Sequence, residues 1–373
     1  MEINRKVLFE LPPYEGVSRN SEGDFIRLPD GKLMFAFTRY YSTSWDDHEN
    51  STICAIYSED GINFNTSEIV TLIKPERVGG SNAMSVSLKK NRDGGISLYC
   101  IVKFDTHDVE HKPVRDEYYR FDSPDGYDFS AEPILCFPKN REGYYAINNS
   151  RVYEISTGRI FIPASEHKMT FSDGKYRFND QGMARFYYSD DGGNSFKEDV
   201  QVLYFPEKEN KDGLQEPGLI ELPDGTLYGF FRTNADYQYE SFSYDGGITW
   251  TDPVPSKFES PLSPLTMGRN PYSGKYYAVW NPYRDDPQSV EHPRFRNTWG
   301  RTPLAIAESE DGIHFCEFKL LESDIHRGYC YSAIYFLSEN EALVSYCSGG
   351  GDIVPLQRTT VSLLTIKKNT YKK

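Results

Sequence analysis

The sequence has no long run of apolar residues. Hydrophobic residues make up 38% of the 373 positions, but no stretch approaches the roughly 20 consecutive residues that a membrane-spanning helix needs. Residues 1–16 (MEINRKVLFELPPYEG) also lack the apolar core and small-residue cleavage site of a secretory signal. We therefore expect a cytoplasmic protein that does not contact membranes, with a trimmed secreted form as the alternative.

Cysteine is scarce and scattered, and no two cysteines show the CxxC spacing of a metal or redox motif. Most of them lie within apolar, strand-like runs, which favours buried free thiols over a disulfide framework or a zinc site. The six are Cys54, Cys100, Cys136, Cys316, Cys330 and Cys347. We expect no metal and no cofactor.

Basic residues are fewer than acidic ones, with 41 Lys and Arg against 55 Asp and Glu. The formal net charge of -14 at pH 7 argues against nucleic acid or an anionic membrane as partner. It does not exclude a small anionic ligand held by a local cluster of arginines.

Residues that form strands and turns are abundant instead. Aromatic residues reach 15%, with 28 Tyr and 23 Phe, alongside 29 Gly and 22 Pro. We find no long helical periodicity. This balance is typical of an all-β protein with many tight connections.

One short motif recurs along the chain at nearly regular intervals. It combines a serine, an aspartate, a glycine and an aromatic residue, so that side-chain oxygens can bond nearby N–H groups while the ring points inward. The copies are Ser58–Phe64, Ser123–Phe129, Ser189–Phe196, Ser243–Trp250 and Ser309–Phe315. Such self-similarity predicts a repeat architecture.

Hairpin turns alternate with the copies of this motif, which we call boxes. They lie at Pro29–Gly31, Arg92–Gly94, Ser156–Gly158, Pro223–Gly225, Pro271–Gly274 and Ser338–Asn340. About 60 residues per unit exceed the ~40 that a four-stranded propeller blade needs. The sequence thus predicts one domain, residues 1–373: a six-bladed β-propeller of four-stranded antiparallel blades. Lys6–Leu11 would join Val361–Lys367 to close the ring, which removes open sheet edges. Two tandem β-sandwiches are the alternative.

The hairpin around Pro223–Gly225 is the most informative one. Glu216 and Arg232 lie at equal distances from Asp224, so we expect them directly opposite each other at the open end of the hairpin.

In a propeller the corresponding ends of all blades converge on a central funnel. When the same reasoning is applied to each hairpin, it predicts that every blade contributes polar residues to the funnel lining: Arg19, Glu22, Arg39, Asp46, Asp47, His48, Asn82, Lys103, Asn148, Asn149, Arg151, Glu166, His167, Glu216, Arg232, Gln238, Tyr239, Ser263, Asn281, Arg301, Tyr329 and Tyr331.

Three separated arginines in this set (Arg19, Arg232 and Arg301) suit a ligand carboxylate, because a guanidinium pairs with a carboxylate bidentately. Ordinary surface salt bridges are the alternative.

These residues resemble the sialidase (neuraminidase) superfamily. The boxes resemble its Asp-box, or BNR, repeat, and the segment from Glu216-Pro217 through Leu222–Gly225 to Arg232 resembles the one that carries its catalytic glutamate and second arginine. Tyr331-Ser332-Ala333-Ile334 is similar to its nucleophile motif. Arg19 and Arg301 fall where the family has its other two arginines, and the similarity runs along nearly the whole chain.

The resemblance implies a retaining exo-glycosidase that cleaves a terminal sialic acid or related 2-keto acid sugar. Tyr331 would be the nucleophile, Glu216 its base, and Asp46 or Asp47 the acid/base. The substrate would contact Arg19, Arg232 and Arg301, and also Arg39, Asn149, Arg151, Gln238 and Tyr239. A neutral tyrosine avoids the repulsion that a carboxylate nucleophile would meet from the substrate's own carboxylate.

Alternatives remain at several positions. Tyr329 competes with Tyr331 as nucleophile, Glu216 could serve only as the ion-pair partner of Arg232, and Asn149 and Arg151 could cap the backbone instead of contacting a sugar. The sequence also departs from the family: Cys347 follows Tyr346 where a glutamate often anchors the first arginine, and Glu22 is a possible substitute. A non-catalytic carbohydrate-binding propeller and a glycosidase for another acidic sugar are therefore the competing functions. Residues 282–299 are expected to shape the pocket rim or a subunit contact.

Overall fold

The computed structural model describes the chain except for residues 105–114, 138–142, 199, 208–209, 283–297 and 368–373. The described residues form strands almost throughout. Their one helix is the 3-10 helix η1 (Pro75–Val78), and no helix among them is long and apolar enough to cross a membrane. Most of the 282–299 insert lies outside the described residues, so its predicted role is not addressed.

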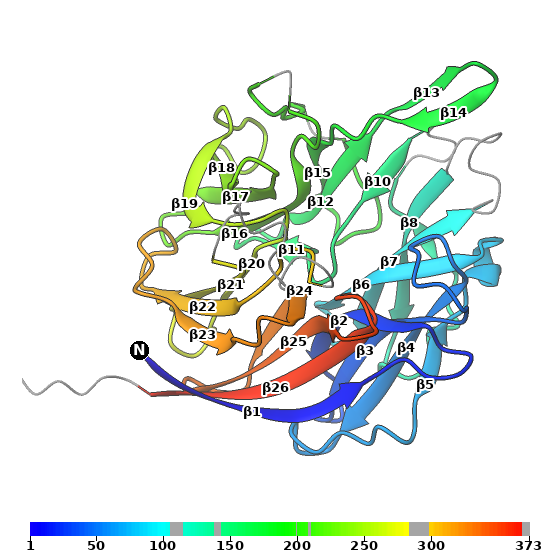
Figure 1. Ribbon diagram of the computed structural model, residues 1–373, viewed down its shortest axis with the longest axis vertical. Helices are drawn as coiled ribbons and strands as arrows, with labels where there is room; N and C mark the ends of the chain where they lie inside the picture. Colours follow the sequence, from blue (N-terminus) through cyan, green and yellow to red (C-terminus); the bar gives the residue numbers. More distant parts are fainter. Residues whose placement is uncertain (105–114, 138–142, 199, 208–209, 283–297, 368–373) are drawn as a thin grey trace, which may run out of the picture.

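Six antiparallel sheets surround a central axis and form the predicted six-bladed propeller (Figure 1). Blade one contains β2 (Arg19–Arg27), β3 (Leu33–Tyr40), β4 (Ser51–Ser58) and β5 (Val70–Ile73). Blade two contains β6 (Asn82–Lys90), β7 (Ile96–Phe104), β8 (Arg115–Ser123) and β9 (Ile134–Leu135). Blade four contains β16 (Gln215–Glu221), β17 (Leu227–Arg232), β18 (Tyr237–Ser243) and β19 (Val254–Glu259). Blade five contains β20 (Thr266–Arg269), β21 (Tyr276–Trp280), β22 (Leu304–Ser309) and β23 (Lys319–Glu322).

Blade three departs from this regular order. Its inner edge is divided between β10 (Tyr144–Ala146) and β11 (Tyr153–Glu154), which pair with successive parts of β12 (Ile160–His167). The other edge of β12 pairs with β15 (Met183–Ser189). A separate two-stranded sheet, β13 (Met169–Ser172) and β14 (Lys175–Phe178), projects from this blade.

The N-terminal strand closes the ring, as the sequence predicted. Blade six orders β24 (Arg327–Phe336), β25 (Glu341–Gly350), β26 (Arg358–Lys367) and then β1 (Glu2–Leu11) at its outer edge. The register runs from Glu2 opposite Lys367 to Leu11 opposite Thr359. Figure 1 shows the blue strand β1 lying along the red strand β26.

The recurring motif forms the same turn after the third strand of five blades. In the first copy, the Gly61 N–H donates to Ser58 Oγ at 2.9 Å, and Ser58 Oγ donates to Asp60 at 3.0 Å. The same two bonds recur from the later serines: Ser123, Ser189, Ser243 and Ser309. The aromatic residue of each box packs into a different apolar cluster: Phe64, Phe129, Phe196, Trp250 and Phe315. The prediction that these rings point inward is confirmed.

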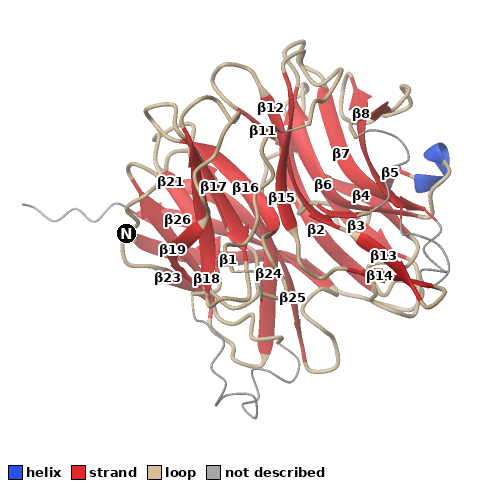
Figure 2. Cartoon of the chain, turned by 90° about the horizontal axis from the view of Figure 1, so that it is seen from above, coloured by secondary structure: helices blue, strands red, loops and turns tan. Residues whose placement is uncertain are grey.

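The apolar core is divided among the spaces between neighbouring blades. Met34 of blade one packs with Leu98 of blade two, and Tyr276 of blade five packs with Tyr228 of blade four. Phe35 of blade one and Leu343 of blade six share the cluster at the closure. The blades lie against one another around the ring (Figure 2), and the second strands of blades one and two, β3 and β7, are buried along their whole length.

The innermost strands carry a feature that the sequence did not reveal. Four of them contain a register shift at equivalent places, and in each a non-glycine residue adopts a positive φ: Glu22 (55°), Ser85 (59°), Glu216 (42°) and Tyr331 (54°). These β-bulges re-aim one side chain per strand, and all four side chains line one small chamber on the axis. Non-glycine residues rarely adopt this conformation, and it tends to be retained at functional sites.

Candidate active site

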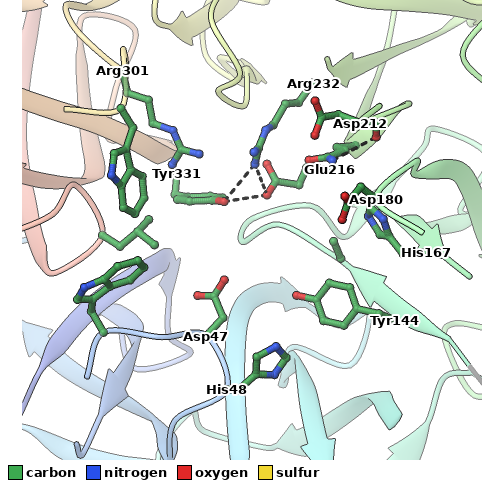
Figure 3. Close-up of a pocket in the computed structure, with 15 residues that line it drawn as sticks. Asp47, His48, Tyr144, His167, Asp180, Asp212, Glu216, Arg232, Arg301 and Tyr331 are labelled. Atoms are coloured by element: carbon green, nitrogen blue, oxygen red, sulfur yellow. Dashed lines mark hydrogen bonds and ion pairs between the residues drawn. The ribbon is translucent and has the colours of Figure 1, made fainter. Parts of the chain in front are cut away.

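A cavity of about 400 Å³ opens at the axial mouth (Figure 3). Side chains from five blades reach it, and its wall consists of Trp45, Asp47, His48, Tyr144, Ala146, His167, Asp180, Asp212, Gln215, Glu216, Arg232, Trp299, Arg301, Tyr331 and Leu356. The axial chamber lies deeper and shares Asp47, Tyr144, Glu216 and Tyr331 with this cavity. The predicted convergence on a central funnel is therefore present for part of the predicted set.

Tyr331 and Glu216 form the centre of the cavity. The Tyr331 hydroxyl donates to Glu216 Oε1 at 2.8 Å, and Arg232 Nη1 donates to the same oxygen at 2.9 Å. Arg232 Nη1 also lies 3.4 Å from the Tyr331 hydroxyl oxygen. One carboxylate thus contacts both a phenol and a guanidinium, as Figure 3 shows.

The predicted register of this hairpin was wrong by one residue. Gln215, not Glu216, lies opposite Arg232, because the bulge shifts the pairing between Gln215 and Gly218. The predicted contact nevertheless exists, since the bulge turns the Glu216 side chain toward the axis, where Arg232 also points.

The Tyr331 phenol is neutral at neutral pH. Burial raises its pKa well above the usual value, the Glu216 carboxylate raises it further, and Arg232 and Arg301 act in the opposite direction. A neutral phenol hydrogen-bonded to a carboxylate can lose its proton to that carboxylate as it attacks an electrophile.

Arg301 lies against the other side of Tyr331. Its guanidinium carbon is 5.6 Å from the Tyr331 ring centroid and 5.3 Å from that of Trp299, while Nη1 contacts Cys330 Sγ at 3.2 Å. Among the residues that the structure describes, Arg232 and Arg301 are the two arginines that line the cavity.

Arg19 does not line the cavity and is completely buried. Its Nη2 donates to Glu22 Oε1 at 2.6 Å and its Nε donates to Ser21 Oγ at 2.7 Å. Its Nη1 donates to the carbonyl of Trp45 at 3.2 Å and to Asp47. Glu22 thus anchors Arg19, as considered from the sequence, and Cys347 Sγ accepts the Glu22 N–H at 3.4 Å.

Of the two adjacent aspartates, Asp47 reaches the cavity and Asp46 does not. Asp46 is exposed and accepts the His48 N–H at 2.8 Å. The backbone of Asp47 is held by two side chains of blade two: Asn82 Nδ2 donates to its carbonyl at 3.1 Å, and Lys103 Nζ donates at 3.0 Å. Asn82 and Lys103, predicted to line the funnel, thus support the loop that presents Asp47.

Five predicted substrate contacts are buried within the scaffold, outside the cavity lining. Arg39 contacts the Tyr14 hydroxyl, Asn149 donates to the carbonyl of Gly23 at 2.7 Å, and Arg151 donates to the carbonyl of Leu265 at 2.5 Å. Gln238 donates to Ser260 Oγ at 2.8 Å, and Tyr239 packs against Phe205. Tyr329 likewise packs in the core against Tyr346, so of the two candidate nucleophiles Tyr331 is the one that lines the cavity.

The sequence reasoning did not single out Trp45, Tyr144, Ala146, Asp180, Asp212, Gln215 and Leu356, which also line the cavity. Trp299, the last residue of the insert that was expected to shape the pocket rim or a subunit contact, lines it too. Asp180 and Asp212 lie in irregular connections of blades three and four. Counting equal distances from a hairpin turn does not locate residues in such connections. The rings of Trp45 and Trp299 lie 5.4 Å apart. The described residues contain no cluster of three or more His, Cys, Asp or Glu side chains that could hold a metal ion, and all six cysteines are free, with Cys316 exposed.

Comparisons with known proteins agree with this architecture. The family model for the BNR repeat-like domain matches residues 82–343. A stretch of 72 residues is 38% identical to the anhydrosialidase of Macrobdella decora; this match covers 19% of the present chain and 8% of that protein.

Solved structures share the fold at low sequence identity. A protein of unknown function from Dyadobacter fermentans superposes with a TM-score of 0.70 at 17% identity, covering 97% of this chain and 99% of that one. The NanB sialidase of Streptococcus pneumoniae superposes with a TM-score of 0.68 at 13% identity, covering 97% of this chain and 70% of that one. The intramolecular trans-sialidase of Ruminococcus gnavus superposes with a TM-score of 0.65 at 12% identity, covering 98% of this chain and 99% of that one. With its repeats, its closed six-bladed ring and the match over residues 82–343, the chain belongs to the BNR repeat-like domain family.

Proposed function

We propose that this protein is a retaining exo-glycosidase that releases a terminal sialic acid or related 2-keto acid sugar, with Tyr331 as nucleophile. The observation that carries the proposal is the 2.8 Å hydrogen bond from the Tyr331 hydroxyl to Glu216 Oε1, beside two cavity-lining arginines. The sialidases among the structural neighbours share only the fold, so the reaction is inferred from this site.

The site groups fit the two steps of retention. In the first, the Tyr331 oxygen bonds to the anomeric carbon while its proton passes to Glu216, and Asp47 protonates the leaving oxygen as the glycosidic bond breaks. In the second, Asp47 takes a proton from water and the water oxygen bonds to the anomeric carbon as the bond from that carbon to the Tyr331 oxygen breaks. Tyr331 then recovers its proton from Glu216.

The arginines suit the charge of the proposed substrate. Arg232 and Arg301 flank Tyr331 from two sides, so a carboxylate on the anomeric carbon lies within reach of both guanidinium groups. Guanidinium forks orient carboxylates bidentately, and a neutral phenol avoids repulsion from that carboxylate. Asp180 and Asp212 line the cavity as well and suit the hydroxyl groups of a sugar as acceptors.

The competing function is a binding propeller without turnover. The internal partners of Arg19 are the observation behind it. This arginine donates four hydrogen bonds within the protein, so in the present arrangement it offers no free pair of donors to orient a substrate carboxylate for turnover.

Hydrolysis of a fluorogenic sialoside by wild type, Tyr331→Phe and Tyr329→Phe separates these functions. We expect turnover by the wild type and by Tyr329→Phe, and a loss of about 10³-fold or more in Tyr331→Phe. Equal activity of wild type and Tyr331→Phe would exclude the tyrosine mechanism. Ligand binding without turnover would favour the binding propeller, and inertness toward sialosides would indicate a different acidic sugar.

A further inference from the structure

Asp47 lies between Arg19 and the cavity. Its side chain is 43% exposed and lines both the cavity and the axial chamber, whereas the Arg19 side chain is fully buried behind it. Of the two carboxylates on Arg19, Glu22 is 4% exposed and is also bonded by Ser85 Oγ at 3.2 Å. Asp47 is therefore the partner that a ligand can replace.

This ion pair has a chemical consequence for an acid catalyst. Burial alone would raise the pKa of Asp47, but Arg19 and then Lys103 lower it to about 2. The other titratable groups that interact with it are His48, Glu22, Tyr40 and Tyr144. In this arrangement Asp47 is ionised at every ordinary pH, and an ionised carboxylate has no proton to give to a leaving group.

A ligand carboxylate has the same charge and shape as the Asp47 carboxylate. It can accept the same Arg19 Nη1 donor once Asp47 turns aside, and buried Glu22 keeps the guanidinium in place from the opposite edge. The Asp47 backbone stays fixed meanwhile, because Asn82 and Lys103 hold its carbonyl and not its side chain. Only side-chain rotation is then required.

We propose that Asp47 and the carboxylate of the substrate compete for Arg19, so that substrate binding itself releases Asp47 to take up the proton that it later donates. This inference rests on the proposed function and goes beyond it by giving Arg19 two alternating carboxylate partners. The protons balance as follows. The ligand binds as an anion, and the Asp47 carboxylate leaves Arg19 Nη1 and takes one proton from solvent. Each ligand bound therefore consumes close to one proton.

The first test measures that proton. Titration calorimetry of the wild type with a 2,3-unsaturated, unreactive analogue of the sugar acid, at pH 5 in buffers of different ionisation enthalpy, gives the number of protons taken up. We expect a value approaching one for the wild type and near zero for Asp47→Asn. Binding of the analogue by the wild type with no proton uptake would overturn the proposal, and this measurement does not depend on how any variant folds.

The second test uses pyruvate, the smallest 2-keto acid, so that it does not depend on the sugar. Asp47→Ala frees Arg19, and we expect pyruvate to bind it at least tenfold more tightly than the wild type. Asp46→Ala is the matched control, because it removes the same charge from the same loop without a contact to Arg19 or a place in the cavity lining, and we expect a change below threefold.

The outcomes separate this inference from the proposed function. Equal gains in Asp47→Ala and Asp46→Ala would show a general charge effect and overturn the exchange, as would a lack of pyruvate binding to Asp47→Ala. If pyruvate behaves as expected while the sugar analogue does not bind, the exchange stands and the proposed sugar substrate is wrong.

Discussion

The Tyr331 hydroxyl donates a 2.8 Å hydrogen bond to Glu216 across a separation of 115 residues in sequence. Both residues occupy β-bulges with positive φ, on the innermost strands of blades six and four. In regular strands these two side chains would point to the faces of their sheets. Because of the bulges they meet on the axis instead. Backbone strain of roughly 1–3 kcal/mol at such a residue persists only where the surrounding packing enforces it.

Replacing Glu216 by glutamine tests the role of this carboxylate. The amide cannot accept the Tyr331 proton, yet its oxygen can still receive the hydrogen bonds of Tyr331 and Arg232. We expect kcat to fall by about 10²–10⁴-fold with little change in KM, measured on the sialoside that the wild type hydrolyses. A change confined to KM would indicate that Glu216 only positions Arg232.

Replacing Arg232 by alanine removes a guanidinium from the cavity wall. We expect kcat/KM to fall by about 100-fold or more, since a charge-assisted bidentate contact contributes roughly 3 kcal/mol, and we expect the variant to retain its fold. Arg185→Ala is a suitable control, because this arginine pairs with Glu166 and Glu198 outside the cavity lining. Unchanged kinetics in Arg232→Ala would remove it from the site.

The buried carboxyl of Asp116 should make stability depend on pH. Burial raises its pKa to about 7, above the value of about 3.9 in an unfolded chain. Because the folded-state pKa is the higher one, the contribution of Asp116 to the unfolding free energy is fully present below about pH 4 and is lost as pH rises through 7. Asp116→Asn never ionises, and its amide oxygen can still accept the Tyr145 N–H that Asp116 binds at 2.9 Å.

We therefore expect Asp116→Asn to gain stability relative to the wild type, by a growing margin, between pH 4 and pH 8 in urea titrations. Asp24 provides a second case, since burial raises its pKa to about 7 as well. A stability difference that stays constant over this range would contradict the assignment.

Deleting residues 1–11 should open the ring at blade six. Strand β1 covers the outer edge of β26 along its whole length, and without it that edge has unpaired backbone groups that invite association. We expect the Tm to fall by about 10 °C or more and oligomers to form, as measured by calorimetry and light scattering. A synthetic peptide of residues 1–11 should restore the Tm in trans; a deletion variant as stable as the wild type would show that closure contributes little.

The serine of each box should stabilise its turn. In the fourth box, Ser243 Oγ accepts the Gly247 N–H at 2.8 Å and donates to Asp245 at 2.9 Å. Ser243→Ala leaves that buried N–H without its partner, so we expect a loss of about 1–2 kcal/mol in the free energy of unfolding. Tyr244→Ala is the adjacent control, since Tyr244 is 75% exposed, and an equal loss there would mean that the box bonds are not responsible.

The sequence by itself determined the repeat, the number of blades and the closure by the N-terminal strand. These features depend on local chemistry: Ser, Asp and Gly define the box turns, Pro and Gly define the hairpins, and a missing sixth box indicates a blade shared between the termini. It also placed Glu216, Arg232, Arg301, Tyr331 and Asp47 among the candidates for the cavity, where they lie.

Only the tertiary structure decided which candidates face the cavity. A hairpin offset cannot detect a bulge, so the register at Glu216 was off by one residue. It also cannot distinguish a polar side chain that bonds to the scaffold, such as Gln238 or Asn149, from one that is open to a ligand. The partners of Arg19 come from one strand and a distant loop, and whether that guanidinium is free or occupied depends on packing that no single segment encodes.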